Sequence, residues 1–154
     1  MRQAVVADSS VFICGKDLEG DLVTVPGVEG ELLDIASRMR LQISGARIEA
    51  PSREALARAR AGAEMTGDAA ALSEVDLALL AKALELSARL ATDDYALQNA
   101  ALHLGIEVET VAMPRIRKVL KRTERCYACG RPVEGDECLV CGTPRRKRKS
   151  GGLR

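Results

Sequence analysis

Ala4-Val5-Val6-Ala7-Asp8 is a short apolar run that ends at an acid, and it sets the architecture of the first part of the chain. Apolar residues in a row without alternation are typical of a strand that is buried on both faces of a parallel sheet. Residues 89–92 repeat the pattern and lead into Asp93. Because segments with helical periodicity separate these two runs, we expect an α/β domain with a mostly parallel sheet.

Periodicity and turn residues outline the rest of this domain. We expect a turn at residues 24–27, helices over about 28–39, 52–60, 72–88 and 95–104, a loop over 62–71, and strands at 46–50 and 106–112. Ser52 is placed to cap the second helix, and Gly105 to end the fourth. Pro114 marks the end of the domain, and a basic connector follows it.

Two Cys-x-x-Cys-Gly pairs with eight residues between them lie near the C-terminus: Cys126, Cys129, Cys138 and Cys141. Four thiolates on two tight turns are the ligand set of structural, tetrahedral zinc. A glycine after each pair lets the turn fold back on the metal. The spacing therefore predicts a small zinc module that needs its metal to fold.

Cysteine usage also bears on the compartment. One metal site accounts for four of the five cysteines, which does not resemble a disulfide framework and indicates a reducing, intracellular location. The remaining Cys14 has apolar neighbours, so we expect a small buried side chain. No apolar run is long enough to span a membrane.

The net charge of +1 conceals two parts of opposite sign. Residues 1–113 carry a net charge of −8, and residues 114–154 carry +9. An acidic body suits an enzyme whose carboxylates hold metal, and a basic tail suits nucleic acid. A solvated acidic domain with a disordered basic tail is the alternative. With only three aromatic residues, a surface of stacked aromatics for single-stranded RNA is not expected.

Five acids are candidates for one site. Asp8, Asp93 and Asp94 follow predicted strands, and ligands of open α/β sheets bind beyond the carboxyl ends of strands. Glu31 and Asp76 are expected near the starts of two helices that point the same way. Carboxylates that converge repel one another unless a divalent cation lies between them. Oxygen ligands alone favour Mg²⁺ or Mn²⁺ over zinc.

Each acid also has a local explanation. Ser73 and Asp76 match a capping box. Thr92 is placed to cap a helix whose first turn holds two acids. Glu31 is placed to lie in the first turn of a different helix, and Asp8 is placed to form an Asx turn. A cap and a metal ligand are compatible roles, because a helix start holds a carboxylate rigidly. Periodicity leaves both interpretations open.

Four acidic boxes in order resemble the PIN-domain nucleases. They are Val6-Ala7-Asp8-Ser9-Ser10, Pro26-Gly27-Val28-Glu29-Gly30-Glu31-Leu32, Leu72-Ser73-Glu74-Val75-Asp76 and Ala91-Thr92-Asp93-Asp94-Tyr95. With the basic linker and the four cysteines attached, the chain is similar to the PIN and zinc-ribbon endoribonucleases that mature the 3′ end of small-subunit ribosomal RNA. The resemblance covers residues 4–142. The interval between the second and third boxes is short, as in the compact archaeal form.

This resemblance implies a three-layer PIN-like domain over residues 1–113, a basic linker over 114–125, a zinc ribbon over 126–144 and a basic flexible tail over 145–154. It implies a cytoplasmic, metal-dependent endoribonuclease that acts on precursor ribosomal RNA of the small subunit, alongside ribosomal assembly proteins. The implied catalytic residues are Asp8, Glu31, Asp76, Asp93 and Asp94. Of these, Asp8, Asp76 and Asp94 would hold Mg²⁺ or Mn²⁺, with Asp94 preferred over Asp93.

The basic connector is the expected RNA contact, through Arg115, Arg117, Lys118, Lys121 and Arg122. The zinc site is closed, so we expect it to position RNA or a ribosomal protein and to take no part in catalysis. Two other functions remain open: a toxin-type PIN ribonuclease that acts on other RNA, and a non-catalytic RNA-binding assembly factor whose acids are only helix caps.

Overall fold

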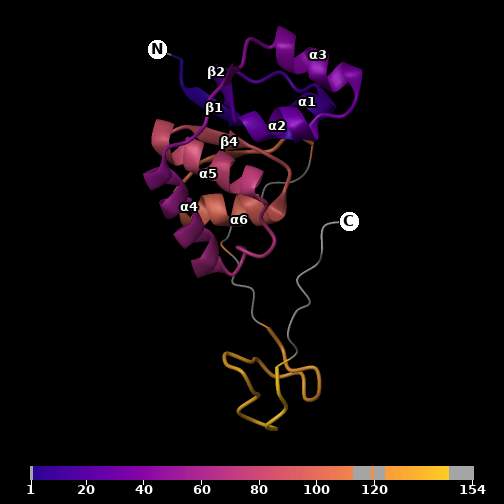
Figure 1. Ribbon diagram of the computed structural model, residues 1–154, viewed down its shortest axis with the longest axis vertical. Coiled ribbons are helices and arrows are strands. Elements are labelled where there is room, and N and C mark those ends of the chain that lie inside the picture. The colour runs from indigo at the N-terminus through magenta and orange to yellow at the C-terminus, as the bar shows by residue number, and fades with distance from the viewer. Residues whose placement is uncertain (1, 113–118, 120–123, 146–154) are drawn as a thin grey trace. The chain divides into compact units, whose positions relative to one another are not determined.

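A computed structural model of the chain describes residues 2–112, 119 and 124–145 (Figure 1). They fall into two units, divided between residues 120 and 121, and each is described by itself. The five basic residues predicted to contact RNA, Arg115, Arg117, Lys118, Lys121 and Arg122, lie outside the described residues.

A parallel five-stranded sheet forms the centre of the first unit. Its strands are β1 (Ala4–Ala7), β2 (Asp21–Thr24), β3 (Arg47–Ile48), β4 (Arg89–Ala91) and β5 (Val108–Glu109), in the order β3-β2-β1-β4-β5. Within β1, Val5 pairs with Leu22 on one side and with Arg89 on the other. The predicted α/β class and parallel sheet are therefore confirmed, and β1 is the central strand.

Six helices in the described part of the first unit cover the two faces of the sheet. They are α1 (Ser9–Cys14), α2 (Pro26–Glu31), α3 (Ile35–Ile43), α4 (Arg53–Thr66), α5 (Glu74–Leu86) and α6 (Tyr95–His103). Figure 1 shows α1 to α3 on one side and α4 to α6 on the other, which gives three layers. The chain reverses its direction across the sheet between β3 and β4, so the neighbours β1 and β4 flank the topological switch point.

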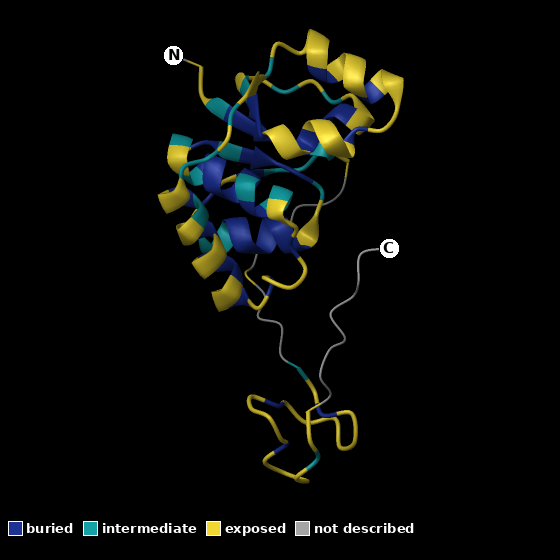
Figure 2. Cartoon of the chain, viewed as in Figure 1, coloured by how far each residue is buried: buried dark blue, intermediate teal, exposed yellow. Residues whose placement is uncertain are grey.

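The core lies between these layers (Figure 2). Leu79 and Leu80 of α5, Leu90 of β4 and Leu97 of α6 are completely buried. Each such side chain contributes about 1.5–3 kcal/mol relative to an exposed one. No helix among the described residues has the length and apolar character needed to cross a membrane.

Two predicted elements between residues 20 and 43 differ from the structure. Residues 21–24 form β2, a strand whose Thr24 is fully buried and donates its hydroxyl to the Ala7 carbonyl at 2.8 Å. The single helix predicted over 28–39 is two helices, because Pro26 begins α2 and the Asp34 side chain caps α3. Glu31 consequently ends α2, and its predicted place near a helix start was wrong.

Helix α4 is longer than predicted. It continues through Gly62 to Thr66, where the sequence indicated a loop. A Cβ at Gly62 would lie 2.6 Å from Cδ2 of Leu104, so this glycine permits close packing and does not end the helix. Cys14, predicted to be buried, is exposed at the end of α1, a helix too short to show periodicity. The capping box of Ser73 and Asp76 is confirmed at the start of α5.

The second unit has almost no apolar core. Its buried cluster consists of Cys126, Val133 and Cys138. Two isolated antiparallel bridges, Arg125 with Pro132 and Glu137 with Pro144, close two turns of the same design. Hydrophobic burial among the described residues of this unit is therefore far smaller than in the first unit.

Candidate active site and metal centre

Asp8 lies immediately beyond the carboxyl end of β1, beside the end of β4. The parallel ladder continues through it, because its N–H donates to the Ala91 carbonyl at 3.0 Å. This is the switch point at which open α/β sheets bind ligands. The side chain also caps α1.

The Asp8 carboxylate is fixed at both oxygens. Oδ1 accepts the Ser9 N–H at 2.6 Å, and Oδ2 accepts the Thr92 hydroxyl at 2.7 Å. Burial raises the pKa of Asp8, and the negative charge of Asp76 raises it further, while the hydrogen bonds from Thr92 and Ser9 oppose the shift. Thr92 was predicted to cap the following helix. It holds Asp8 in place instead, and Asp94 is the cap.

Glu31 and Asp76 approach Asp8 from two helices. Asp76 lies in the first turn of α5, where its Oδ2 accepts the Ser73 N–H at 2.8 Å. Partial burial raises the pKa of Glu31. A hydrogen bond from Ser9 lowers this pKa, and the negative charges of Asp8 and Asp76 raise it. The negative charges of these three carboxylates, from the residue after β1, the end of α2 and the first turn of α5, therefore act on one another.

A glycine sets the distance between α2 and α5. A Cβ at Gly27 would lie 2.5 Å from Cγ2 of Val75, a contact that no side chain tolerates. Gly27 is in the first turn of α2, and Val75 directly precedes Asp76. The close approach of the two helices, and with it the spacing of Glu31 and Asp76, depends on the missing side chain.

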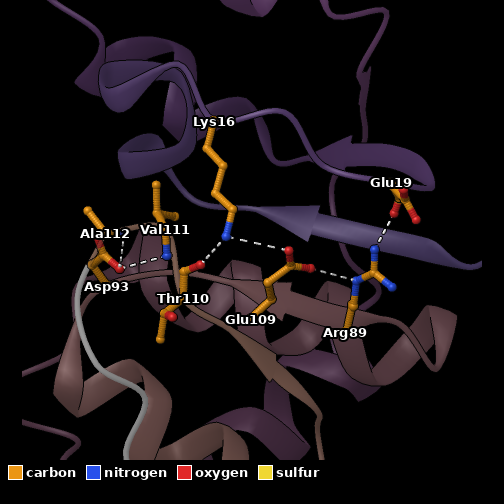
Figure 3. Close-up of polar contacts among 8 residues, drawn as sticks. All are labelled: Lys16, Glu19, Arg89, Asp93, Glu109, Thr110, Val111 and Ala112. Carbon is orange, nitrogen blue, oxygen red and sulfur yellow. Dashed lines mark hydrogen bonds and ion pairs between the residues drawn. The ribbon is translucent and has the colours of Figure 1, made fainter.

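Asp93 and Asp94 have different surroundings. Asp94 is exposed, caps α6 by accepting the Leu97 N–H at 3.1 Å, and donates its own N–H to the Thr92 hydroxyl oxygen at 3.1 Å. The carboxylate of Asp93 accepts the N–H groups of Val111 and Ala112 at 2.8 and 3.0 Å (Figure 3). Asp94 is thus linked to Asp8 through Thr92, whereas Asp93 holds the segment that follows β5.

A second set of charges, which the sequence did not indicate, connects β4, β5 and the loop after α1. Arg89 forms an ion pair with Glu109 at 2.9 Å and donates a hydrogen bond to the Glu19 carbonyl (Figure 3). Lys16 forms an ion pair with the same Glu109 at 3.6 Å and donates a hydrogen bond to the Thr110 carbonyl. These contacts join residues far apart in the chain, so no local pattern indicates them. They attach β5 to the loop after α1.

The four cysteines converge on one point of the second unit. Their Sγ atoms all lie within 4.8 Å of one another, with 3.7 Å between Cys126 and Cys141 and 3.6 Å between Cys129 and Cys138. These distances are far longer than a disulfide bond. In the described part of the chain, no other group of three or more His, Cys, Asp or Glu side chains meets this spacing. The group can hold one metal ion.

Each cysteine pair closes the same turn. The Gly130 N–H donates to the Cys126 carbonyl, and the Gly142 N–H donates to the Cys138 carbonyl, both at 2.8 Å. Both glycines have a positive φ, 74° and 69°. The predicted role of the glycines in folding each turn back is confirmed.

Comparisons with known proteins identify the family. Residues 5–86 match the family described as the PIN domain of ribonuclease. Endoribonuclease Nob1 of Pyrococcus abyssi is 41% identical over 152 residues, which cover 94% of this chain and 92% of that protein. Endoribonuclease Nob1 of Archaeoglobus fulgidus is 38% identical over 143 residues, 90% of this chain and 86% of the relative.

A further relative, Ribonuclease VapC3 of Aeropyrum pernix, is 44% identical over 118 residues, 70% of this chain and 85% of its own length. The two Nob1 matches extend over more of this chain than the VapC3 match does. With the five-stranded parallel sheet and the four-cysteine group both present, the chain belongs to the PIN-domain ribonucleases and, within them, to the Nob1 endoribonuclease family.

Proposed function

We propose that this chain cleaves precursor small-subunit ribosomal RNA near its 3′ end, with a divalent cation held by Asp8, Asp76 and Asp94 and with Glu31 in support. The observation that carries the proposal is the Asp8 carboxylate at the switch point of the sheet, fixed by hydrogen bonds from Ser9 and Thr92. The charge effects of Asp76 on Asp8, and of Asp8 and Asp76 on Glu31, agree with it. The name endoribonuclease, which the Nob1 relatives carry, supports the reaction class, and the resemblance of the ordered acidic boxes and four cysteines to nucleases of ribosomal RNA maturation supports the substrate.

The donor set fits a hard cation. All its atoms are carboxylate oxygens, which favours Mg²⁺ or Mn²⁺. Burial raises the pKa values of Asp8 and Glu31, and repulsion between the like charges raises them further when no cation lies between them. Mg²⁺ keeps several water molecules as ligands. A site whose carboxylates are spaced more openly than the four cysteines therefore suits it.

The protein residues have separate tasks in this proposal. A bound cation would lower the pKa of a water and stabilise charge on the phosphate oxygens of the substrate. Thr92 and Ser9 orient the Asp8 carboxylate through their hydrogen bonds. Glu31 is exposed at the end of α2 with a raised pKa, so it is suited to take up a proton from the attacking water.

We propose zinc for the cysteine group. Four sulfur atoms about 2.3 Å from a tetrahedral ion lie about 3.8 Å apart. The Sγ distances of 3.6 and 3.7 Å agree with that value. Zinc would supply the stability that the small apolar cluster cannot.

The proposed division of labour follows the charges. In this proposal residues 1–113 are the nuclease domain, 114–125 a basic linker, 126–144 the ribbon and 145–154 a basic tail. The linker side chains Arg115, Arg117, Lys118, Lys121 and Arg122 would bind RNA phosphates, and the ribbon would position RNA or a ribosomal assembly protein. A four-thiolate site requires reduced cysteines, which agrees with a cytoplasmic location.

The test is cleavage by the full chain of an RNA that contains the small-subunit 3′ end and its downstream extension. With Mn²⁺ we expect one major cut near the mature end, and none with a chelator present. The VapC3 relative makes a toxin-type ribonuclease the second candidate. Faster cleavage of a transfer or messenger RNA would favour that candidate, and tight RNA binding without cleavage would favour an assembly factor.

A further inference from the structure

The outward face of α3 is apolar. Ile35, Met39 and Ile43 are 77%, 55% and 79% exposed and lie four residues apart, so they form one stripe along the helix. The buried residues of α3 are Ser37 and Leu41, on the opposite side. A helix that presents apolar side chains both to its own core and to water has an unpartnered face.

Other exposed surface of the first unit differs. The exposed residues of α4 are mostly charged or small: Arg53, Glu54, Ala57, Arg58, Arg60, Ala61, Glu64 and Met65. Near α3 the exposed aliphatic side chains continue through Leu33, which is 82% exposed, and Ile13 of the neighbouring helix α1. Single exposed apolar residues need no explanation, but a contiguous group marks an interaction surface.

Two arginines flank the stripe. Arg38 donates to the Leu32 carbonyl at 2.6 Å, and Arg40 donates to the Phe12 and Ile13 carbonyls. Within residues 2–112, no carboxylate oxygen lies within ion-pair distance of either guanidinium. The nearby Asp34 is bound to Ser37, and its pKa is lowered chiefly by those hydrogen bonds and only weakly by the charge of Arg40.

A groove continues the surface at the C-terminal end of α3. It has a volume of about 720 Å³, and its lining includes the apolar Leu18, Leu22 and Ile43 and the charged Asp17, Asp21, Arg40 and Arg47. A concave site of this size that combines apolar and charged groups can receive an anchoring side chain from a partner. Arg40 and Ile43 belong to both the stripe and the groove.

We propose that the α3 face docks a protein partner that presents an apolar helical stripe bordered by carboxylates. The apolar stripe calls for apolar partner residues, and the unpaired charges of Arg38 and Arg40 call for acidic ones. This inference goes beyond the proposed nuclease activity, since none of the five candidate acids lies on this face.

Three other occupants fit the charges and side chains less well. RNA would contact the cations but gain nothing from aliphatic side chains, which cannot stack as aromatic rings do. A second copy of α3 would place Arg38 and Arg40 against their own equivalents. The chain's own basic linker, residues 114–125, carries the same sign of charge as those arginines.

Three synthetic helical peptides test the proposal against the full, zinc-loaded chain by fluorescence anisotropy. The first peptide carries leucines four residues apart, flanked by glutamates. The second carries the same leucines, flanked by lysines. The third keeps the glutamates and has alanines in place of the leucines. We expect the first to bind roughly tenfold more tightly than either of the others. The double variant Ile35→Ser/Met39→Ser should lose that affinity. Met65→Ser, which changes an exposed methionine of α4, should keep it, and both variants should cleave RNA normally.

Four results would overturn the proposal. They are equal binding of the glutamate and lysine peptides, no binding of any peptide, and unchanged affinity in the double variant. The fourth is a dimer that the double variant dissociates, which would make a second copy the occupant. RNA affinity that falls in the double variant, while the peptides do not bind, would identify an RNA surface.

Discussion

The hydroxyl of Thr92 donates to Oδ2 of Asp8 at 2.7 Å, across 84 residues of sequence. The same oxygen of Thr92 accepts the N–H of Asp94 at 3.1 Å, so one buried side chain connects two candidate ligands. Its place beside the switch point explains why a threonine at the end of β4 matters to a carboxylate at the end of β1.

Thr92→Val keeps the shape of this side chain and removes its hydrogen bonds. Because the bond from Thr92 lowers the pKa of Asp8, its loss raises that pKa further. We expect the acid limb of the pH–rate profile to move to higher pH, and stability to fall by about 1–2 kcal/mol. Thr92→Ser should restore both. An unmoved pH profile in Thr92→Val would show that Thr92 has only a structural role.

Metal should stabilise the first unit in a pH-dependent way. The pKa values of Asp8 and Glu31 are higher in the folded chain than their ordinary values. Without a cation, the stability that these two groups contribute is therefore fully present at any pH below the ordinary pKa values. This contribution to stability is lost as the pH rises through the pKa values that the two groups have in the folded chain. A cation favours the ionised carboxylates and opposes that loss.

At 100 times its Kd, Mn²⁺ should therefore raise Tm by roughly 10–15 °C at pH 7 and by much less at pH 4. Asp8→Asn, which removes the buried charge, should raise the metal-free Tm at pH 7 and abolish the response to Mn²⁺. Calorimetry over this pH range measures both effects. An equal response to Mn²⁺ at both pH values would contradict the assignment of Asp8 as a ligand.

Gly27→Ala should separate α2 from α5. The added Cβ would meet Val75 at 2.5 Å, and a valine has little rotamer freedom in a helix. Overpacking of this kind costs about 1–3 kcal/mol, and the shift of α2 should also reduce kcat. Gly30→Ala is the matched control on the same helix, because nothing lies within 4 Å of a Cβ there. Equal activities of the two variants would mean that helix spacing does not set the site.

Zinc removal should unfold the second unit and leave the first intact. We expect about one zinc per chain, and a chelator or Cys138→Ser should abolish the amide NMR signals of the folded turns at residues 126–142. Signals from the sheet residues should persist, because that unit has its own core. A folded second unit with less than about one metal ion per chain would rule out the four-cysteine assignment.

The main fold was predictable where local pattern and burial agree. The apolar runs of β1 and β4 and the capping box of α5 are local features, and all three are present. Strand β2 was missed because its first residues are Asp21 and a half-buried leucine, and because Pro26 indicated a turn. The apolar residues Leu33, Ile35 and Met39 follow helical spacing, yet they face water, since periodicity cannot distinguish a buried apolar face of a helix from an exposed one.

The candidate site was predictable in part for the same reason. The rule that ligands bind beyond strand ends brings Asp8 and Asp94 to one edge of the sheet from sequence alone. The bond from Thr92 to Asp8 and the contact of Gly27 with Val75 join residues far apart in the chain, so they follow only from the register of β1 with β4 and from helix packing. The choice between Asp93 and Asp94 likewise depends on Val111, beyond the next strand.

The most direct test of the central claim is Asp8→Asn, measured for Mn²⁺ binding, RNA binding and cleavage of the precursor RNA. Asparagine keeps the helix cap, so the fold should persist while the charge on the cation is lost. We predict that cleavage falls by roughly 100-fold or more with RNA affinity retained. Glu29→Gln, at an exposed acid two residues before Glu31, should cleave normally. Cleavage by Asp8→Asn at the unmodified rate in Mn²⁺ would contradict a carboxylate-held catalytic ion.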